Sequence, residues 1–223
     1  MSIVVTLLSI IGTVTAYLLS RKIANKKPSP FTTPVFLSTV LIILVMVMTG
    51  TSYGQYEQAK DIMTYLLGPA TVALAVPIYK NRHLIVQYCV PAGTGLILGS
   101  IVTIFLSILI GGLFQLSEVL ISSLAVKSAT VPIAIEISHI INGDMSITAA
   151  FVIITGILGA MLGPWLLTKT NITNPVARGL AVGTISHGIG TAEIAREGEL
   201  QGAVSGTAMA IAAIFTSIFV PLL

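Results

Sequence analysis

The sequence predicts an all-α fold: a polytopic transmembrane helical bundle of about seven or eight spans, several of them broken by glycine and proline. Hydrophobic residues make up 55% of the 223 residues and charged residues only 9%, whereas a soluble domain carries about 25% charged residues. The apolar runs approach the roughly 20 residues that a membrane-crossing helix needs, and they lack the alternation of barrel strands. These observations exclude a soluble enzyme, a nucleic-acid-binding protein and a disordered chain.

Eight apolar segments are the candidate spans, and we expect them to form a single integral membrane domain over residues 1–223. In chain order they cover residues 2–20, 34–50, 63–79, 84–114, 118–141, 146–168, 176–195 and 202–223. Backbone polar groups in lipid must bond within their own segment, which favours helices. Proline removes a backbone donor and clashes with the preceding turn, so segments such as 63–79 and 118–141 are expected to break.

Basic residues predict the orientation of the first spans. Four of them follow the first apolar segment, namely Arg21, Lys22, Lys26 and Lys27. The positive-inside rule places them in the cytoplasm and the N-terminus outside, and two further crossings bring Lys80 and Arg82 to the cytoplasmic side as well. We therefore attribute the net charge of +3 to basic residues in cytoplasmic loops, and we expect no nucleic-acid partner. We expect the chain in the lipid bilayer of a bacterial plasma membrane.

An internal echo links two of the interrupted segments. Ala70-Thr71-Val72 matches Ala129-Thr130-Val131, within residues 68–78 and 127–137. A true duplication would have repeat units around residues 63–114 and 118–168. Paired Gly/Pro-interrupted segments in matching positions indicate a transporter binding site, because the freed N–H groups at half-helix N-termini attract anions. Either the repeat is parallel or one segment is re-entrant, and the sequence leaves both open.

Charged residues inside the apolar segments are strong functional candidates, because a charge near the membrane centre costs about 2.5–3.5 kcal/mol and usually faces a protein-lined cavity. Lys127 begins the second echo segment and is followed by Ser128 and Thr130. In a cavity its ammonium would attract a carboxylate. The alternative is that Lys127 snorkels to an interface or lies in a loop. Glu136 and His139 share a helical face. Either Glu136 carries a proton, or the two residues form a structural pair near the inner membrane face.

The densest polar island is the stretch GTISHGIGTAE in the seventh candidate segment. Its glycines, Gly188 and Gly190 among them, allow close backbone approach, and Ser186 and Thr191 offer hydroxyl groups. An unperturbed histidine side chain changes its charge near neutral pH, so His187 is a candidate proton carrier as well as a ligand-binding residue. The alternative is an ordinary hydrogen-bonded interior histidine.

The sequence lacks the motifs of several common kinds of active site. There is no closely spaced Cys/His/carboxylate set suited to zinc, no G-x-x-x-x-G-K-[ST] loop for ATP and no G-x-S-x-G nucleophile elbow. The single cysteine, Cys89, has no intrachain partner for a disulfide. We therefore expect no enzymatic activity, no metal site and no cofactor.

Three stretches resemble the LrgB/CidB family of bacterial membrane proteins: LLGPATVALAVPIYK (residues 66–80), KSATVPIAIEIS (127–138) and NPVARGLAVGTISHGIGTAE (174–193). The closing residues 202–223 also fit, so the resemblance covers nearly the whole chain. The form S-H-G-I-G-T is closer to the CidB side of the family.

The resemblance implies two kinds of function. Members are described as holin- or antiholin-like proteins that modulate murein hydrolase export and cell lysis, usually with a small LrgA/CidA-type membrane partner. Other relatives are described as carriers of small carboxylates, among them pyruvate uptake systems and the plastidial glycolate/glycerate transporter of plants, which joins an LrgA-like half to an LrgB-like half.

We expect a secondary transporter of small monocarboxylates, pyruvate- or glycolate-like, with proton coupling through Glu136 or His187. The expected substrate-binding residues are Lys127 for the anion and, around it, Thr71, Ser128, Thr130, Ser186, His187, Gly188, Gly190 and Thr191. The alternative is a holin/antiholin-like protein, which gives these residues no role. Glycines in residues 84–114 suit close helix packing, so we expect a homodimer or a complex with an LrgA/CidA-like chain.

Overall fold

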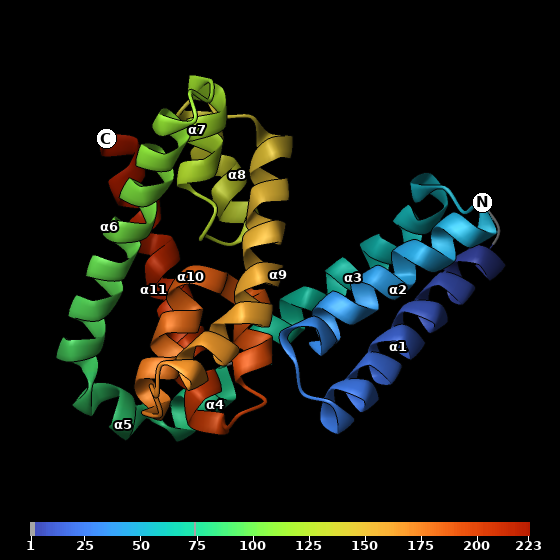
Figure 1. Ribbon diagram of the computed structural model, residues 1–223, viewed down its shortest axis with the longest axis horizontal. Helices are drawn as coiled ribbons and strands as arrows, with labels where there is room; N and C mark the ends of the chain where they lie inside the picture. The colour runs from blue at the N-terminus through green and yellow to red at the C-terminus, as the bar shows by residue number, and fades with distance from the viewer. Residues whose placement is uncertain (1–2, 74) are drawn as a thin grey trace. The chain divides into compact units, whose positions relative to one another are not determined.

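The computed structural model describes residues 3–73 and 75–223, without the side chains at positions 64, 67, 68, 70, 71, 73, 75, 77, 78, 84 and 85. The described chain is all-α, as predicted (Figure 1). It divides into two compact units, Met1–Ala75 and Val76–Leu223. The expectation of one integral membrane domain stays a prediction.

The first unit is a set of three helices. They are α1 (Ile3–Lys26), α2 (Pro34–Thr49) and α3 (Tyr53–Ala73), with the short 3-10 turn η1 (Pro30–Thr32) before α2. Pro34 occupies the first position of α2, where its missing N–H is not needed. Gly50 ends α2 in the left-handed conformation with φ 66°, which favours glycine. Thr6 of α1 donates to Gln58 of α3 at 2.9 Å and joins these two helices.

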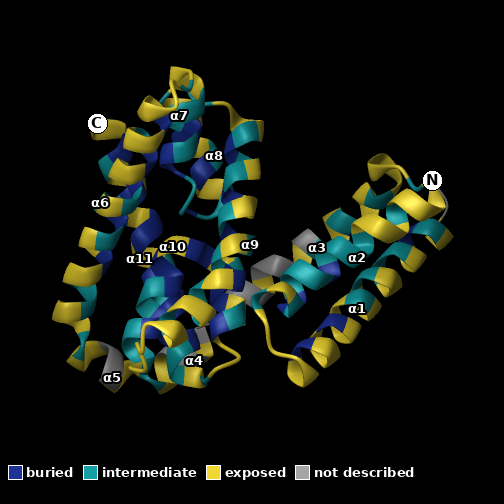
Figure 2. Ribbon diagram, viewed as in Figure 1, coloured by how far each residue is buried: buried dark blue, intermediate teal, exposed yellow. Residues whose placement is uncertain are grey.

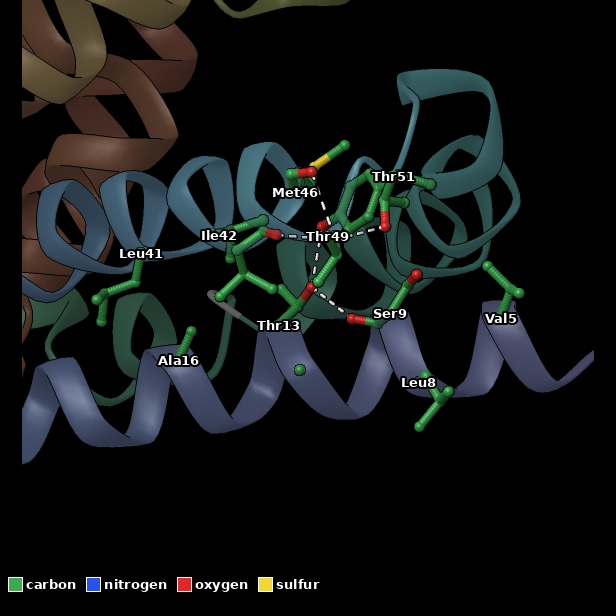
Figure 3. Close-up of a pocket in the computed structure, with 13 residues that line it drawn as sticks. Val5, Leu8, Ser9, Thr13, Ala16, Leu41, Ile42, Met46, Thr49 and Thr51 are labelled. Atoms are coloured by element: carbon green, nitrogen blue, oxygen red, sulfur yellow. Dashed lines mark hydrogen bonds between the residues drawn. The ribbon is translucent and has the colours of Figure 1, made fainter.

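A cavity of about 300 Å³ lies between the helices of the first unit, lined mostly by aliphatic side chains (Figure 3). Thr13 donates to the Ser9 carbonyl at 2.7 Å, so in the 3.0 Å contact between Thr13 and Tyr56 the tyrosine is the donor. Thr49 donates to a carbonyl of its own helix at 2.8 Å and accepts from Thr51 at 2.7 Å. These hydroxyl groups are therefore already paired within the protein.

The rest of the chain is a succession of helices of unequal length. They are α4 (Ala75–Lys80), α5 (Arg82–Gln87), α6 (Cys89–Leu113), α7 (Glu118–Ala125), α8 (Val131–Ile140), α9 (Met145–Lys169), α10 (Pro175–Ile194), α11 (Glu199–Phe219) and the 3-10 turn η2 (Val220–Leu222). Asp144 and Asn174 cap the N-termini of α9 and α10 with their side chains. Buried residues concentrate on α10 and α11 (Figure 2), whereas α6 and α9 keep exposed apolar faces.

Within the described residues, four helices are long and apolar enough to cross a membrane: Ile3–Lys26, Cys89–Leu113, Met145–Lys169 and Glu199–Leu222. The predicted count of seven or eight spans is not confirmed. Residues 118–141 are divided between α7 and α8, and α10 is interrupted at His187. From composition alone, each apolar segment is predicted to cross the membrane once. An interrupted segment can instead turn back, which reduces the number of crossings.

α10 is a helical hairpin, here called the second hairpin, with His187 at its tip. His187 has φ 40° and ψ −141°, outside the helical region. Arg178, near the start of α10, binds Glu197, just beyond its end, at 2.6 Å, although a straight helix would separate two residues this far apart in sequence by about 28 Å. A Cβ atom on Gly190 would lie 2.9 Å from the Val182 side chain, so the two arms pack against each other.

α7 and α8 form the first hairpin, with residues 127–130 at its tip. Ser123 of α7 accepts from the Asp144 N–H at 2.9 Å, although Asp144 lies beyond the far end of α8. Gly143 packs against Ser123 and Ser138, one residue from each arm. The chain therefore turns back where the second echo segment begins. The internal repeat itself stays a prediction.

α9 packs against both hairpins, one toward each of its ends. Near its start, Thr148 donates to Ser138 of the first hairpin at 2.7 Å. Near its end, the Pro164 carbonyl accepts from Arg178 of the second hairpin at 3.2 Å. Since both contacts involve residues near the hairpin bases, the bases lie at opposite ends of α9 and the tips point toward each other (Figure 1).

Candidate functional site

Lys127 lies at the tip of the first hairpin and reaches α6. Its Nζ atom donates to the Ser107 hydroxyl at 2.6 Å, and Ser107 donates in turn to the Thr103 carbonyl at 2.7 Å. Within the part of the chain that the structure describes there are three ion pairs, and none involves Lys127. The half-buried ammonium therefore has a neutral partner, and an anionic ligand would compensate its charge better than a hydroxyl does.

Ser128 and Thr130 complete the tip of the first hairpin. The Ser128 hydroxyl is buried and, among the described residues, lacks a hydrogen-bond partner. Thr130 is the N-cap residue of α8, with extended backbone angles, and its carbonyl accepts from the Ala134 N–H at 2.8 Å. The N-terminus of α8, with its partial positive charge, thus begins at the tip beside Lys127. Three residues predicted to bind substrate, Lys127, Ser128 and Thr130, therefore lie together at the first tip.

His187 forms the tip of the second hairpin and is buried against α9. Its Nε2 atom lies 2.9 Å from the Val152 carbonyl oxygen; because a carbonyl only accepts, Nε2 carries the proton. A Cβ atom on Gly156 would lie 2.5 Å from the imidazole ring, and one on Gly159 would overlap the Ser186 hydroxyl. Glycine at these two positions is what allows the tip to approach the α9 backbone.

Thr191 fastens the second hairpin to α11. Its hydroxyl donates to the His187 carbonyl at 2.8 Å, so in the 2.8 Å contact with Ser205 of α11 the serine is the donor. Both hydroxyl groups are buried. Ser186, His187 and Thr191 therefore lie together in the second hairpin, but the Thr191 hydroxyl is occupied by protein partners, and the binding role of all three stays a prediction.

Val152 connects the two tips. Its carbonyl binds His187 of the second hairpin. Its side chain lies in an apolar cluster with Ala129 and Ala134 of the first hairpin and with Ile104 of α6. The tips of the first and second hairpins therefore reach the same turn of α9.

The other predicted residues are placed less centrally or fall outside the described part. Glu136 is exposed on α8, and its role in proton coupling stays a prediction. Gly188 is exposed, whereas Gly190 packs against Ser186. Thr71 lies in α3, and its side chain lies outside the described residues.

Two serines of α6 belong to this region but were missed by the sequence reasoning. Ser107 binds Lys127, and Ser100, which is 5% exposed, has a buried hydroxyl without a partner among the described residues. Their spacing could have indicated them. Ser100 and Ser107 are seven residues, or about two helical turns, apart, so both hydroxyls lie on one face of an otherwise apolar span. Small hydroxyl residues bond readily to their own helix, so the signal is weak by itself.

The fold and the site define a class: a helical membrane protein in which two opposed hairpins with polar tips meet between long apolar helices. In the described residues no group of three or more His, Cys, Asp or Glu side chains is placed to hold a metal ion. Residues 13–223 match the LrgB-like family, and the chain belongs to that family.

The relatives are similar along almost their whole length. Uncharacterized protein YxaC from Bacillus subtilis is 36% identical over 218 residues, covering 98% of this chain and 95% of the relative. The holin-like protein CidB is 32% identical in Staphylococcus epidermidis, over 97% of this chain and 94% of the relative. CidB of Staphylococcus aureus is 32% identical over 97% of this chain and 95% of the relative. No solved structure matches the chain.

Proposed function

We propose that this protein is a secondary transporter of small monocarboxylates in the bacterial cell membrane. The observation that carries the proposal is the environment of Lys127: a half-buried ammonium at a hairpin tip, hydrogen-bonded to the Ser107 hydroxyl and to no carboxylate among the described residues. Placing a positive charge inside an apolar bundle is unfavourable in free energy, and binding of an anion would compensate that charge.

The substrate carboxylate binds between Lys127 and the N-terminus of α8. The Ser128 hydroxyl, which is buried beside them, donates a hydrogen bond to the same anion. The Ser186–His187 tip of the second hairpin forms the opposite wall, held by its bond to Val152. Two hairpins with bases at opposite ends of α9 suit alternating access, because each tip can separate from the site on a different side of the membrane.

Coupling to protons requires a titratable group near the site. His187 is the stronger candidate, because it is buried at a tip and its ring contacts the turn of α9 that both tips share. Glu136 is the second candidate, one and a half turns into α8 from the first tip. An inward proton gradient would then drive accumulation of the acid anion.

The test is uptake of labelled pyruvate, and separately of glycolate, by vesicles reconstituted with the purified protein. Wild-type protein is expected to give saturable uptake, and Lys127→Ala is expected to abolish it. Lys169→Ala is the matched control, because Lys169 is an exposed lysine at the end of α9. Saturable uptake that survives Lys127→Ala in a folded, monodisperse protein would remove the basis of the proposal.

A holin- or antiholin-like function is the second candidate, favoured by the similarity to the holin-like protein CidB of the Staphylococcus relatives. In that function the chain would modulate murein hydrolase activity and cell lysis together with an LrgA/CidA-type partner, or as a homodimer. It predicts leakage of a large trapped dye from the same vesicles, without saturation and without dependence on Lys127. Dye leakage combined with non-saturable pyruvate flux would favour this function over transport.

A further inference from the structure

α6 presents one buried face to both hairpins, and its members are Leu96, Ser100, Ile104, Ser107 and Gly111. Leu96 packs with Leu180 of the second hairpin and with Ala208 of α11. Ile104 packs with Ala129 and its neighbours in the first hairpin. Ser100 lies midway between them on this face, so it is placed at the boundary between the apolar clusters of the two hairpins.

The Ser100 hydroxyl is the unusual feature of this boundary. It is buried, and among the described residues it has no hydrogen-bond partner. A buried hydroxyl left unpaired costs about 1–3 kcal/mol. Most serines and threonines in helices avoid that cost by donating to a carbonyl of the same helix, as Thr103 does to Gly99 at 2.6 Å and Ser107 to Thr103 at 2.7 Å.

The position of Ser100 relative to the two tips follows from its neighbours along α6. A Cβ atom on the preceding Gly99 would lie 3.7 Å from the Thr184 methyl, and Thr184 is one turn before the tip of the second hairpin. Two turns further along α6, Ser107 binds Lys127 at the first tip. Ser100 therefore lies about 10 Å along the α6 axis from Ser107, on the side toward the second hairpin.

We propose that Ser100 is a substrate-binding residue: its hydroxyl bonds to the anion whose carboxylate is held by Lys127. This inference rests on the proposed function and extends the site from the first hairpin to α6. Ser128 reaches the ligand from the first tip and Ser100 reaches it from α6, so the two buried hydroxyls that lack a partner among the described residues bind one ligand.

The experiment compares Ser100→Ala with Thr103→Val in purified protein. Thr103 is a suitable control because it lies on the same helix and its hydroxyl already bonds within that helix. Ser100→Ala is expected to raise the KM for pyruvate about tenfold with Vmax within about twofold, which is the effect of losing roughly one hydrogen bond. Thr103→Val is expected to leave both values within about twofold of wild type.

Thermal unfolding gives a second readout that a merely structural role would not produce. Because Ser100→Ala removes an unpaired buried hydroxyl, it is expected to leave the Tm without pyruvate unchanged or higher, and to reduce the Tm increase that pyruvate causes in wild type. An unchanged KM and an unchanged pyruvate-dependent Tm increase in Ser100→Ala would overturn this inference and leave the transport proposal intact. If wild-type protein shows neither saturable uptake nor stabilisation by pyruvate, both proposals fall.

Discussion

The Arg178 guanidinium binds both carboxylate oxygens of Glu197, at 2.7 Å through Nε and at 2.6 Å through Nη2. Its remaining N–H groups donate to the Ile172 and Pro164 carbonyls and to the Thr168 hydroxyl. Arg178 therefore joins the two ends of the second hairpin to each other and to the end of α9. A mostly buried arginine with this many partners sets where the hairpin base lies.

Replacing Glu197 by Gln is expected to destabilise the protein by about 3 kcal/mol, because it leaves the buried guanidinium without its compensating charge. Thermal unfolding in detergent measures the effect. The control is Asp61→Asn, which breaks the exposed pair with Lys60 and is expected to change stability by less than about 1 kcal/mol. Equal effects of the two substitutions would show that the Arg178–Glu197 pair does not hold the hairpin closed.

Gly159→Ala is expected to destabilise the protein by about 2 kcal/mol or more, because its Cβ atom would overlap the Ser186 hydroxyl at the second tip. Gly12→Ala serves as the control: a Cβ there meets no atom of the described residues within 4 Å, and alanine in a helix is favoured by up to about 1 kcal/mol over glycine. The measurement is the Tm of each variant. A neutral Gly159→Ala would mean that the tip does not pack on α9 as described.

Thr191→Val is expected to lower stability by about 1–2 kcal/mol, because the buried Ser205 hydroxyl loses its acceptor. The KM for pyruvate is expected to stay within about twofold of wild type, since the Thr191 hydroxyl is already committed to His187 and Ser205. The control is Thr216→Val, whose hydroxyl bonds only within α11 among the contacts described. A large rise in KM with unchanged Tm would return Thr191 to the list of ligand-binding residues.

A disulfide between α6 and the second hairpin is expected to block transport. A Cβ on Gly99 would lie 3.7 Å from the Thr184 Cγ2 atom, so cysteines introduced by Gly99→Cys and Thr184→Cys would lie on contacting faces of α6 and the second hairpin, where a disulfide can form. In a Cys89→Ser background, oxidation is expected to abolish pyruvate uptake, and a reductant is expected to restore it. The two single-cysteine variants, treated in the same way, control for oxidation alone; full activity of the cross-linked protein would show that this arm does not move against α6.

The sequence could indicate the interruptions before Pro132 and at His187, because proline and glycine act locally, but Pro69 and Pro164 lie inside the continuous helices α3 and α9. It could not predict that the chain turns back at these breaks, because that depends on contacts between residues far apart, such as Arg178 with Glu197 and Ser123 with Asp144. The sequence also could not predict the partner of Lys127. Serine is common in apolar helices, and Ser107 becomes the partner only because folding places the first tip beside it.

The turning back of both hairpins has a consequence for membrane sidedness. Each hairpin returns to the end of the bundle from which it enters, and in the described part of the second unit the helices long and apolar enough to cross a membrane are α6, α9 and α11. The end of the bundle at the start of α6 also holds the base of the second hairpin, where Arg178 pairs with Glu197 and Arg196 with Glu193. Arginine and lysine, which decide orientation, are absent from the first hairpin between Glu118 and Asp144 except for Lys127 at its tip. The positive-inside rule predicts that the end with the two arginines is cytoplasmic. Three crossings by α6, α9 and α11 would then leave the end of α11 on the outer side, where an attached epitope would be reached by antibody in intact spheroplasts.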